Sequence, residues 1–258
     1  MKEYTPSVEI VGSAAAAAER AAERIIAWMS NRSPLTLGLA TGATMTPLYA
    51  RLVAAHRAGL ISFREVTSFN LDEYVGVAAG SPASFHRYMQ DHLLEHVDIE
   101  AARARIPNGM ADDVAAEAAS YEEQIAASGG IDLLLLGIGA NGHIGFNEPG
   151  SNFASRTREV SLDETTRIAN AGGFSDLASV PRRAITMGVA TILEARHILL
   201  IATGSEKAAA VAAAIEGPIG SACPASALRL HRNVEIICDE QAAAALATWP
   251  QKKDRRRA

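Results

Sequence analysis

The sequence predicts an α/β fold, a three-layer Rossmann-like sandwich around a mainly parallel sheet. Strand-like and helix-like segments alternate along the chain, as they do where helices connect parallel strands. The clearest strand, Ile131–Leu136, is a nearly continuous apolar run, which suits a strand covered by helices on both faces. The length of 258 residues fits one domain, which we place at residues 1–250 because no linker rich in Pro, Gly or Ser interrupts the alternation.

The elements of the N-terminal half begin and end at recognisable signals. Ser13 can cap an Ala-rich helix, whose Glu and Arg residues distinguish it from low-complexity sequence. Thr46-Pro47 opens a second helix, and Gly129-Gly130 ends a later one. We therefore expect helices at Ala14–Met29, Thr46–Leu60, Ser81–His96 and Ala111–Ala127, and strands at Leu35–Leu39 and Val66–Leu71.

The C-terminal half continues the alternation after Ile131–Leu136. We expect helices at Gly188–Ala195 and Ser205–Ile215, and strands at His197–Ala202 and Val234–Cys238. The last segment, Gln251–Ala258, has five basic residues in eight. We interpret it as a flexible, solvated tail, and a phosphate-binding arm is the alternative.

Composition and charge exclude several classes of protein. The chain has 24 Lys and Arg against 29 Asp and Glu, a net charge of −5, whereas a nucleic-acid binder usually has a basic excess. No apolar run reaches the ~18 residues of a membrane span, and Met1–Ile10 lacks the apolar region of a signal peptide. Cys223 and Cys238 are too few for a disulfide scaffold or a cysteine metal site. We expect a cytoplasmic enzyme.

Two segments at predicted strand ends carry groups suited to a substrate. The Gly/Thr-rich turn of Thr41, Gly42, Ala43 and Thr44 offers backbone N–H groups and hydroxyls to a phosphate, although an ordinary strand-to-helix turn is the alternative. It lacks the Gly-Lys-Ser/Thr ending of a Walker loop. Farther on, Asp72 and Glu73 are adjacent, so they point to different sides and at most one faces a substrate. A solvated acidic loop is the alternative there.

A third segment, residues 137–149, contains Gly-x-Gly-x-x-Gly directly after a strand. It is not a dinucleotide fingerprint, because Asn, Pro and Gly residues interrupt the helix that such a motif should open. His143, with Glu148 five positions on, instead suggests a general acid/base pair. The spacing differs from zinc-binding His-Glu-x-x-His, so we expect no metal. We interpret the other six histidines as structural.

Several motifs together resemble glucosamine-6-phosphate deaminases. They are Phe-Asn-Leu-Asp-Glu-Tyr at 69–74, Gly-Ile-Gly-x-Asn-Gly-His-Ile-Gly-Phe-Asn-Glu-Pro at 137–149, Thr-Arg-Ile-Ala-Asn at 166–170 and Ala-Ile-Thr-Met-Gly at 184–188. The likeness runs from about Ile10 to Ala245 with the motifs in the family's order. The resemblance implies a hydrolase and aldose–ketose isomerase that converts glucosamine 6-phosphate and water to fructose 6-phosphate and ammonia, without a cofactor.

The resemblance also implies roles for individual residues. Asp72 would take the C2 proton and return it to C1. His143 would open the pyranose ring, helped by Glu148 and Asn141. Thr41, Gly42, Ala43 and Thr44 would hold the phosphate together with Lys207, and Gly137 and Gly139 would also contact the substrate.

The chain departs from the family's pattern at four positions. Gly172 stands where many members have a phosphate-binding Arg, and Val160 stands where regulated members have a Lys for an allosteric phosphate. Ala43 replaces a usual Gly or Ser, and Arg229 replaces a usual Gln. Our hypothesis is that Arg229 restores the missing charge. A salt bridge at the surface is the alternative fate of Arg229, and Arg182 or Arg183 is the alternative source of the charge.

Other functions stay open at this point. A related enzyme could act on another sugar phosphate, as an isomerase or as a 6-phosphogluconolactonase-type hydrolase, and a non-catalytic sugar-phosphate sensor is a third possibility. The expected partner is a small sugar phosphate, not a nucleic acid or a membrane. Because the family spans monomers and hexamers, a homo-oligomer is possible.

Overall fold

The computed structural model describes residues 2–247, apart from the side chains at positions 169 and 173. Within that part of the chain, seven strands form one sheet in which every neighbouring pair is parallel. The strand order is β1 (Ser7–Val11), β10 (Val234–Asp239), β9 (His197–Ala202), β6 (Leu133–Leu136), β2 (Leu35–Leu39), β3 (Val66–Asn70) and β5 (Ala104–Arg105). The chain changes direction across the sheet between β2 and β6, where open α/β sheets bind their ligands.

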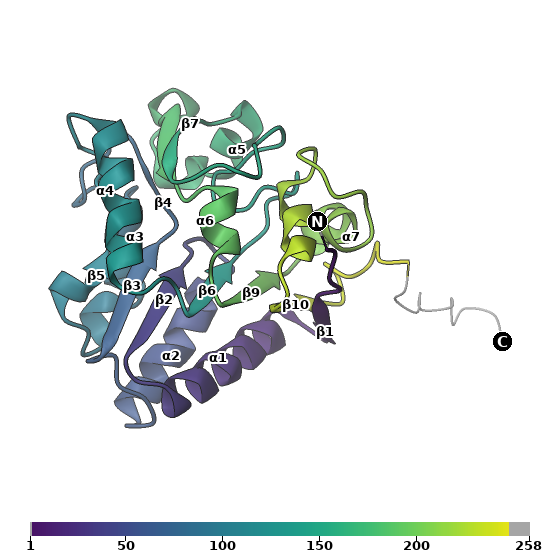
Figure 1. The fold of residues 1–258 in the computed structure, drawn as a ribbon, viewed down its shortest axis with the longest axis horizontal. Coiled ribbons are helices and arrows are strands. Elements are labelled where there is room, and N and C mark those ends of the chain that lie inside the picture. The colour runs from purple at the N-terminus through teal and green to yellow at the C-terminus, as the bar shows by residue number, and fades with distance from the viewer. Residues whose placement is uncertain (1, 248–258) are drawn as a thin grey trace.

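Helices cover both faces of the sheet, which confirms the predicted three-layer fold. α1 (Ala14–Asn31) and α2 (Thr46–Arg57) lie side by side against one face, and α4 (Val114–Ala127) and α6 (Val189–Leu193) lie over the other (Figure 1). On that second face the ring of Tyr121 packs edge-on against Phe69 of β3, with 5.6 Å between the ring centroids. All of β6 is buried, as expected for a strand between two helical layers.

Most predicted elements are present, and the differences lie at their ends. α1 begins after its cap, Ser13, and β2 and β9 have the predicted bounds. The helix predicted from Ser81 begins only at Phe85, as α3 (Phe85–His92), because the residues before it form turns. The helix predicted from Ser205 is a 3-10 turn followed by α7 (Ala208–Ile215). Further 3-10 turns are Leu94–His96, Ala101–Arg103, Ala171–Gly173, Leu177–Ser179 and Pro224–Leu230.

The sequence does not predict the second sheet. Among the described residues, β4 (Asp72–Tyr74), β8 (Arg183–Thr186) and β7 (Arg158–Ser161) form a small antiparallel sheet in the order β4-β8-β7. Strands this short show no alternation that a sequence pattern could reveal. The short α5 (Glu164–Ala169), between β7 and β8 in the chain, was missed for the same reason. This sheet matters for function because Asp72 is the first residue of β4.

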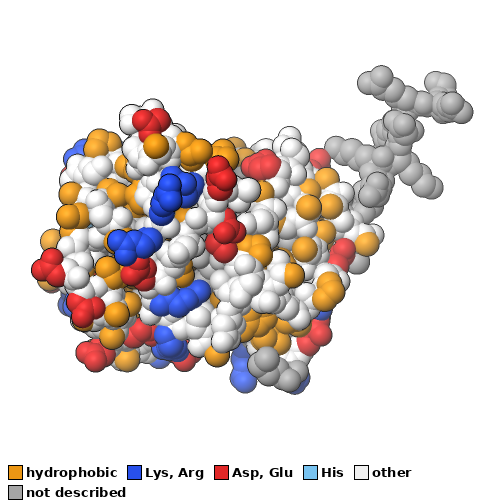
Figure 2. Space-filling model, turned by 90° about the horizontal axis from the view of Figure 1, so that it is seen from above, with side chains coloured by type: hydrophobic (Ala, Val, Ile, Leu, Met, Phe, Trp, Pro, Cys, Tyr) orange, Lys and Arg blue, Asp and Glu red, His pale blue; other side chains and the backbone are white. Residues whose placement is uncertain are grey.

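The molecular surface carries both signs of charge. On the face that includes β7 and α5, acidic and basic side chains are interspersed and neither forms one large patch (Figure 2). Among residues 2–247, no helix is both long and apolar enough to cross a membrane. The basic segment Gln251–Ala258 lies outside the described residues, so the prediction about it is not tested here.

Candidate active site

A cavity of about 620 Å³ opens at the carboxyl ends of the central strands. Five segments and Phe85 of α3 line it; the segments are residues 40–45 after β2, 71–72 after β3, 137–146 after β6, 165–170 around α5, and 206–207 after β9. These include the three segments that the sequence marked as suited to a substrate. They meet because parallel strands direct their carboxyl ends to the same edge of a sheet.

Asp72 is the buried carboxyl group of this cavity. It lies where β3 passes into β4, is only 7% exposed, and pairs with Thr186 in the small sheet. Burial, and after it the nearby negative charge of Glu73, together raise the pKa of Asp72 to about 8. A carboxylate in this setting is a stronger base than an exposed one, which suits it to removing a proton from carbon.

Glu73 lies on the other side of β4 and does not line the cavity, as expected for adjacent residues of a strand. Its carboxylate is 2% exposed and accepts four hydrogen bonds. The donors are the backbone N–H groups of Tyr74, Phe85 and His86 and the hydroxyl of Ser84, at 2.6–3.1 Å. Glu73 therefore ties β4 to the start of α3.

The loop after β6 is shaped by glycines that nothing larger could replace. A Cβ atom at Gly139 would lie within 2.5 Å of the His143 ring, and one at Gly142 would lie 2.6 Å from Sγ of Cys223. Gly142 also has a φ of 86°, a conformation that side chains disfavour. The backbone N–H of Gly139 donates to the carbonyl of His143 at 2.9 Å. The loop thus folds back on itself and presents His143 to the cavity.

His143 and Glu148 form the pair that the sequence suggested. The Nδ1 atom of His143 lies 3.4 Å from a carboxylate oxygen of Glu148, and the side-chain amide of Asn141 donates to that same oxygen at 2.9 Å. Burial alone would raise the pKa of Glu148, but polar contacts with His143, Thr166 and Asn141 lower it to about 2. Glu148 is therefore ionised at neutral pH and can hold a proton on Nδ1 of His143.

Asn141 orients Glu148 and not the imidazole. Its Nδ2 group donates to the carboxylate, and its Oδ1 atom accepts from the backbone N–H of His143. Among the described residues, no hydrogen bond joins the side chain of Asn141 to the ring of His143. Asn141 instead acts one step away, on the carboxylate that faces the ring.

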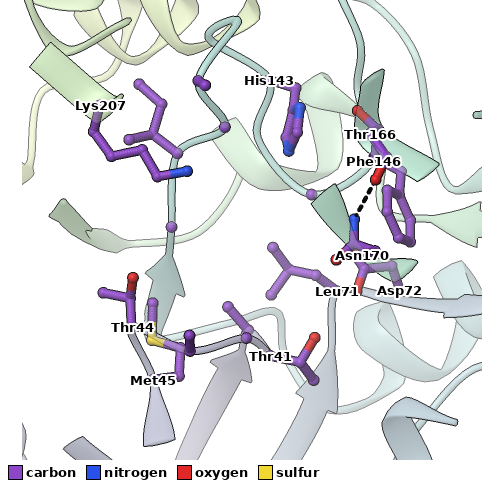
Figure 3. A pocket seen from close by; sticks show the side chains of 18 of the residues that line it. Thr41, Thr44, Met45, Leu71, Asp72, His143, Phe146, Thr166, Asn170 and Lys207 are labelled. Atoms are coloured by element: carbon purple, nitrogen blue, oxygen red, sulfur yellow. Dashed lines mark hydrogen bonds between the residues drawn. The ribbon is translucent and has the colours of Figure 1, made fainter. Parts of the chain in front are cut away.

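The turn at 41–44 lies across the cavity from this pair. Thr44 and Lys207 approach from one side, and Asp72 and His143 lie on the other (Figure 3). Gly42 has a φ of 111°, and its carbonyl accepts a hydrogen bond from the backbone N–H of Met45 at the start of α2. Lys207 follows Gly204, whose N–H donates to both carboxylate oxygens of Asp239 at 3.1 and 3.2 Å. The cavity thus has a cationic end with free hydroxyls and a separate end with acid/base groups.

Comparison with known proteins places the chain in a family. Residues 11–237 match the family model described as glucosamine-6-phosphate isomerases/6-phosphogluconolactonase. The chain belongs to this family. It is 49% identical over 240 residues to a glucosamine-6-phosphate deaminase of Shewanella loihica, covering 93% of this chain and 90% of that relative.

Solved structures of the family agree with this assignment. A structure described as a monomeric glucosamine-6-phosphate deaminase matches with a TM-score of 0.90 and 44% identity, covering 93% of this chain and 99% of that one. The 6-phosphogluconolactonase from Trypanosoma cruzi matches with a TM-score of 0.78 and 23% identity, covering 95% and 98% of the two chains. The second likeness shows a common fold only.

The structure brings most of the predicted site residues of this family member together. The predicted residues that line the cavity are Thr41, Gly42, Ala43, Thr44, Asp72, Gly137, Gly139, Asn141, His143 and Lys207. Glu148 does not line the cavity, but its carboxylate lies 3.4 Å from Nδ1 of His143. Within residues 2–247, no group of three or more His, Cys, Asp or Glu side chains is placed to hold a metal ion.

The structure does not bring Arg229 to the cavity. Its guanidinium donates to the carbonyl of Gly217 at 2.5 Å and forms an ion pair with Glu3. Arg182 and Arg183 do not line the cavity either, and Arg183 pairs with Glu159 at 2.7 Å on the small sheet. Among the described residues that line the cavity, Lys207 is the only lysine or arginine. Nothing there replaces the arginine whose place Gly172 takes.

Several lining residues were not selected from the sequence. Phe85 and Phe146 stack with 5.8 Å between their ring centroids and form an apolar wall, and Glu206 stands beside Lys207. Thr166 and Asn170 also line the cavity, and they belong to the Thr-Arg-Ile-Ala-Asn motif. That motif was the one available signal for them. Phe146 belongs to the motif at 137–149, but its stacking on Phe85 had no signal, because the two residues come from segments far apart in the chain.

Proposed function

We propose that this protein is a glucosamine-6-phosphate deaminase, which isomerises the amino-sugar phosphate and releases ammonia to form fructose 6-phosphate. The observation that carries the proposal is a buried carboxyl group, Asp72, in the same cavity as the His143–Glu148 pair. Close relatives that bear this enzyme name, at 49% identity across nearly the whole chain, support it.

Ring opening is the first step and falls to His143. The closed pyranose opens when a proton moves from the C1 hydroxyl to the ring oxygen; a neutral imidazole can accept the hydroxyl proton and then, as imidazolium, deliver a proton to the ring oxygen. Glu148 is ionised and lies 3.4 Å from Nδ1 of His143, so it stabilises the protonated imidazole that forms between the two proton transfers. Asn141 holds Glu148 in place for this task.

Isomerisation follows in the open-chain sugar and falls to Asp72. Ionised Asp72 takes the proton from C2, and the electron pair of that bond forms the C1–C2 double bond of an enolamine as the C1 aldehyde oxygen gains a proton. Returning a proton to C1 leaves an imine at C2. Water adds to this imine and ammonia leaves, which gives the ketone. We therefore describe the activity as an isomerising deamination, a fuller description than the label hydrolase.

The phosphate would lie at the opposite end of the cavity. There the hydroxyls of Thr41 and Thr44, the N–H groups of their turn and the ammonium of Lys207 offer donors to an anion. Binding energy from this remote end would position C2 at Asp72. A cytoplasmic location and a homo-oligomer stay predictions from the sequence.

Ammonia release tests the proposal. The purified protein is assayed with glucosamine 6-phosphate, its galacto and manno epimers, and 6-phosphogluconolactone, with Asp72→Asn as the matched inactive variant. We expect ammonia from glucosamine 6-phosphate with the parent protein and none with the variant. Lactone hydrolysis without ammonia release would favour the lactonase alternative, and binding without turnover of any sugar would favour a sensor.

A further inference from the structure

The hydrogen bonds of Glu73 lead beyond the residues that line the cavity. Glu73 is buried, sits next to Asp72 in β4, and is directed away from the cavity. A buried carboxylate is costly unless hydrogen bonds compensate it. Here four donors do so, and three of them belong to the start of α3: Ser84, Phe85 and His86.

α3 in turn contacts the cavity at two places. Near its start, Phe85 lines the cavity and packs against Tyr74, with 4.8 Å between ring centroids. One turn later, the hydroxyl of Tyr88 donates to the carbonyl of Gly42 at 2.8 Å and lies 3.0 Å from the hydroxyl of Thr46. The same short helix therefore touches the wall beside Asp72 and the turn expected to hold the phosphate.

We propose that Glu73 is a positioning residue, which fixes the start of α3 to the strand that carries Asp72 and so holds the base, the aromatic wall and the turn at 41–44 in one arrangement. Glu73 itself contacts no substrate. Its effect on the phosphate end runs through Tyr88 and Gly42. The inference rests on the proposed function, since it assigns Glu73 a part in that same site.

Glu73 also acts on Asp72 through its charge. Asp72 interacts electrostatically with Tyr49 of α2, Tyr74 of β4 and Tyr121 of α4, and it shares the cavity with His143, Glu206 and Lys207. The pKa values of all three tyrosines are raised by burial, so these groups stay neutral at working pH. Glu73 is the carboxylate neighbour that, after burial itself, contributes most to the raised pKa of Asp72.

Three variants separate these effects. Glu73→Gln removes the negative charge. It also puts an amide in place of the carboxylate, one oxygen of which accepts hydrogen bonds from the hydroxyl of Ser84 and the backbone N–H of His86. Ser84→Ala keeps the charge and removes one donor, and Tyr88→Phe removes only the contact with Gly42. Glu123→Gln, an exposed residue of α4, is the matched control for loss of one carboxylate.

The first readout is the titration of the Asp72 carboxyl by carbon-13 NMR, assigned with Asp72→Asn, beside the pH profile of kcat/KM. In Glu73→Gln we expect the midpoint of both to fall by about one pH unit. In Ser84→Ala, Tyr88→Phe and Glu123→Gln the midpoint should stay at its parent value, because these changes leave the charge beside Asp72 in place.

The second readout is binding at the phosphate end. We expect the KM for the sugar phosphate to rise about 5-fold in Ser84→Ala and Tyr88→Phe, the effect of about one lost hydrogen bond. The dissociation constant of inorganic phosphate should rise with it. Glu123→Gln should match the parent in both.

Two results would overturn the inference. One is an unchanged Asp72 midpoint in Glu73→Gln; the other is parent-like phosphate binding in both Ser84→Ala and Tyr88→Phe. If Glu73→Gln does not fold, the two α3 variants still decide. If no sugar phosphate yields ammonia with the parent, the proposed function fails, whereas the NMR titration and phosphate binding still test Glu73.

Discussion

Replacing Asp72 by Asn should abolish catalysis and stabilise the fold. The folded pKa of Asp72 is about 8, against 3.8 for an ordinary Asp, so between these values the folded state binds more protons than the unfolded state. Stability therefore falls as pH rises through this window, by about 1.4 kcal/mol per pH unit. The parent carries a cost of about 4 kcal/mol at pH 7, which a neutral amide of the same shape would avoid.

Urea unfolding at two pH values measures this cost. From about pH 5 to about pH 7, the stability advantage of Asp72→Asn over the parent should grow by about 3 kcal/mol. Ammonia release by the variant should fall by about 1000-fold or more, because an amide accepts no proton. An advantage that is the same at both pH values would show that Asp72 is already ionised in the folded protein at pH 5, so that its pKa is not raised. The account of Asp72 as a buried base would then be wrong.

Four further outcomes follow from the site. Asp72 must be ionised to act as a base, and at pH 7 only about a tenth of the protein molecules carry it in the ionised form, so kcat/KM should rise about 10-fold between pH 7 and pH 9. A flat pH profile of kcat/KM would contradict this. His143→Gln should slow turnover of the closed ring more than that of an open-chain analogue, and equal losses would refute its role in ring opening. Lys207→Ala should raise KM by about 10-fold or more, with a weaker dependence of KM on salt than the parent. Arg229→Gln should leave KM within about 2-fold of the parent, since Arg229 binds Gly217 and Glu3. A large rise in KM would instead indicate that Arg229 contributes to substrate binding.

Five of the seven strands of the main sheet could be predicted because they have a strong signal, whereas β1 and β5 were not predicted. Runs such as Leu133–Leu136 are apolar throughout, and the helices between them have caps and glycine ends. The small sheet could not, because its strands are three or four residues long and pair across distant segments. The start of α3 was predicted too early for a related reason. Its first turn is decided by Glu73, a partner that lies outside the helix.

Some residues of the candidate site could likewise be predicted from the sequence, and others could not. Asp72 and His143 follow predicted strands, so the rule that strand ends meet at one edge predicts that they lie together, whereas Lys207 was predicted from the family resemblance. Arg229 was expected there because it replaces a usual Gln of the family and could restore a missing charge. Its position depends on Glu3, at the other end of the chain, and no local pattern reveals that pairing. The stacking of Phe85 on Phe146 is likewise a product of tertiary packing.

The position of β10 has a consequence for how the enzyme matures on the ribosome. β1 (Ser7–Val11) pairs with β10 (Val234–Asp239), which follows all the other strands of the main sheet in the chain, so β1 has no partner strand until these have been synthesised. The same late strand supplies Asp239, which holds the N–H of Gly204 before Lys207. A nascent chain that lacks β10 therefore has neither the partner strand of β1 nor the carboxylate that holds Gly204 in place.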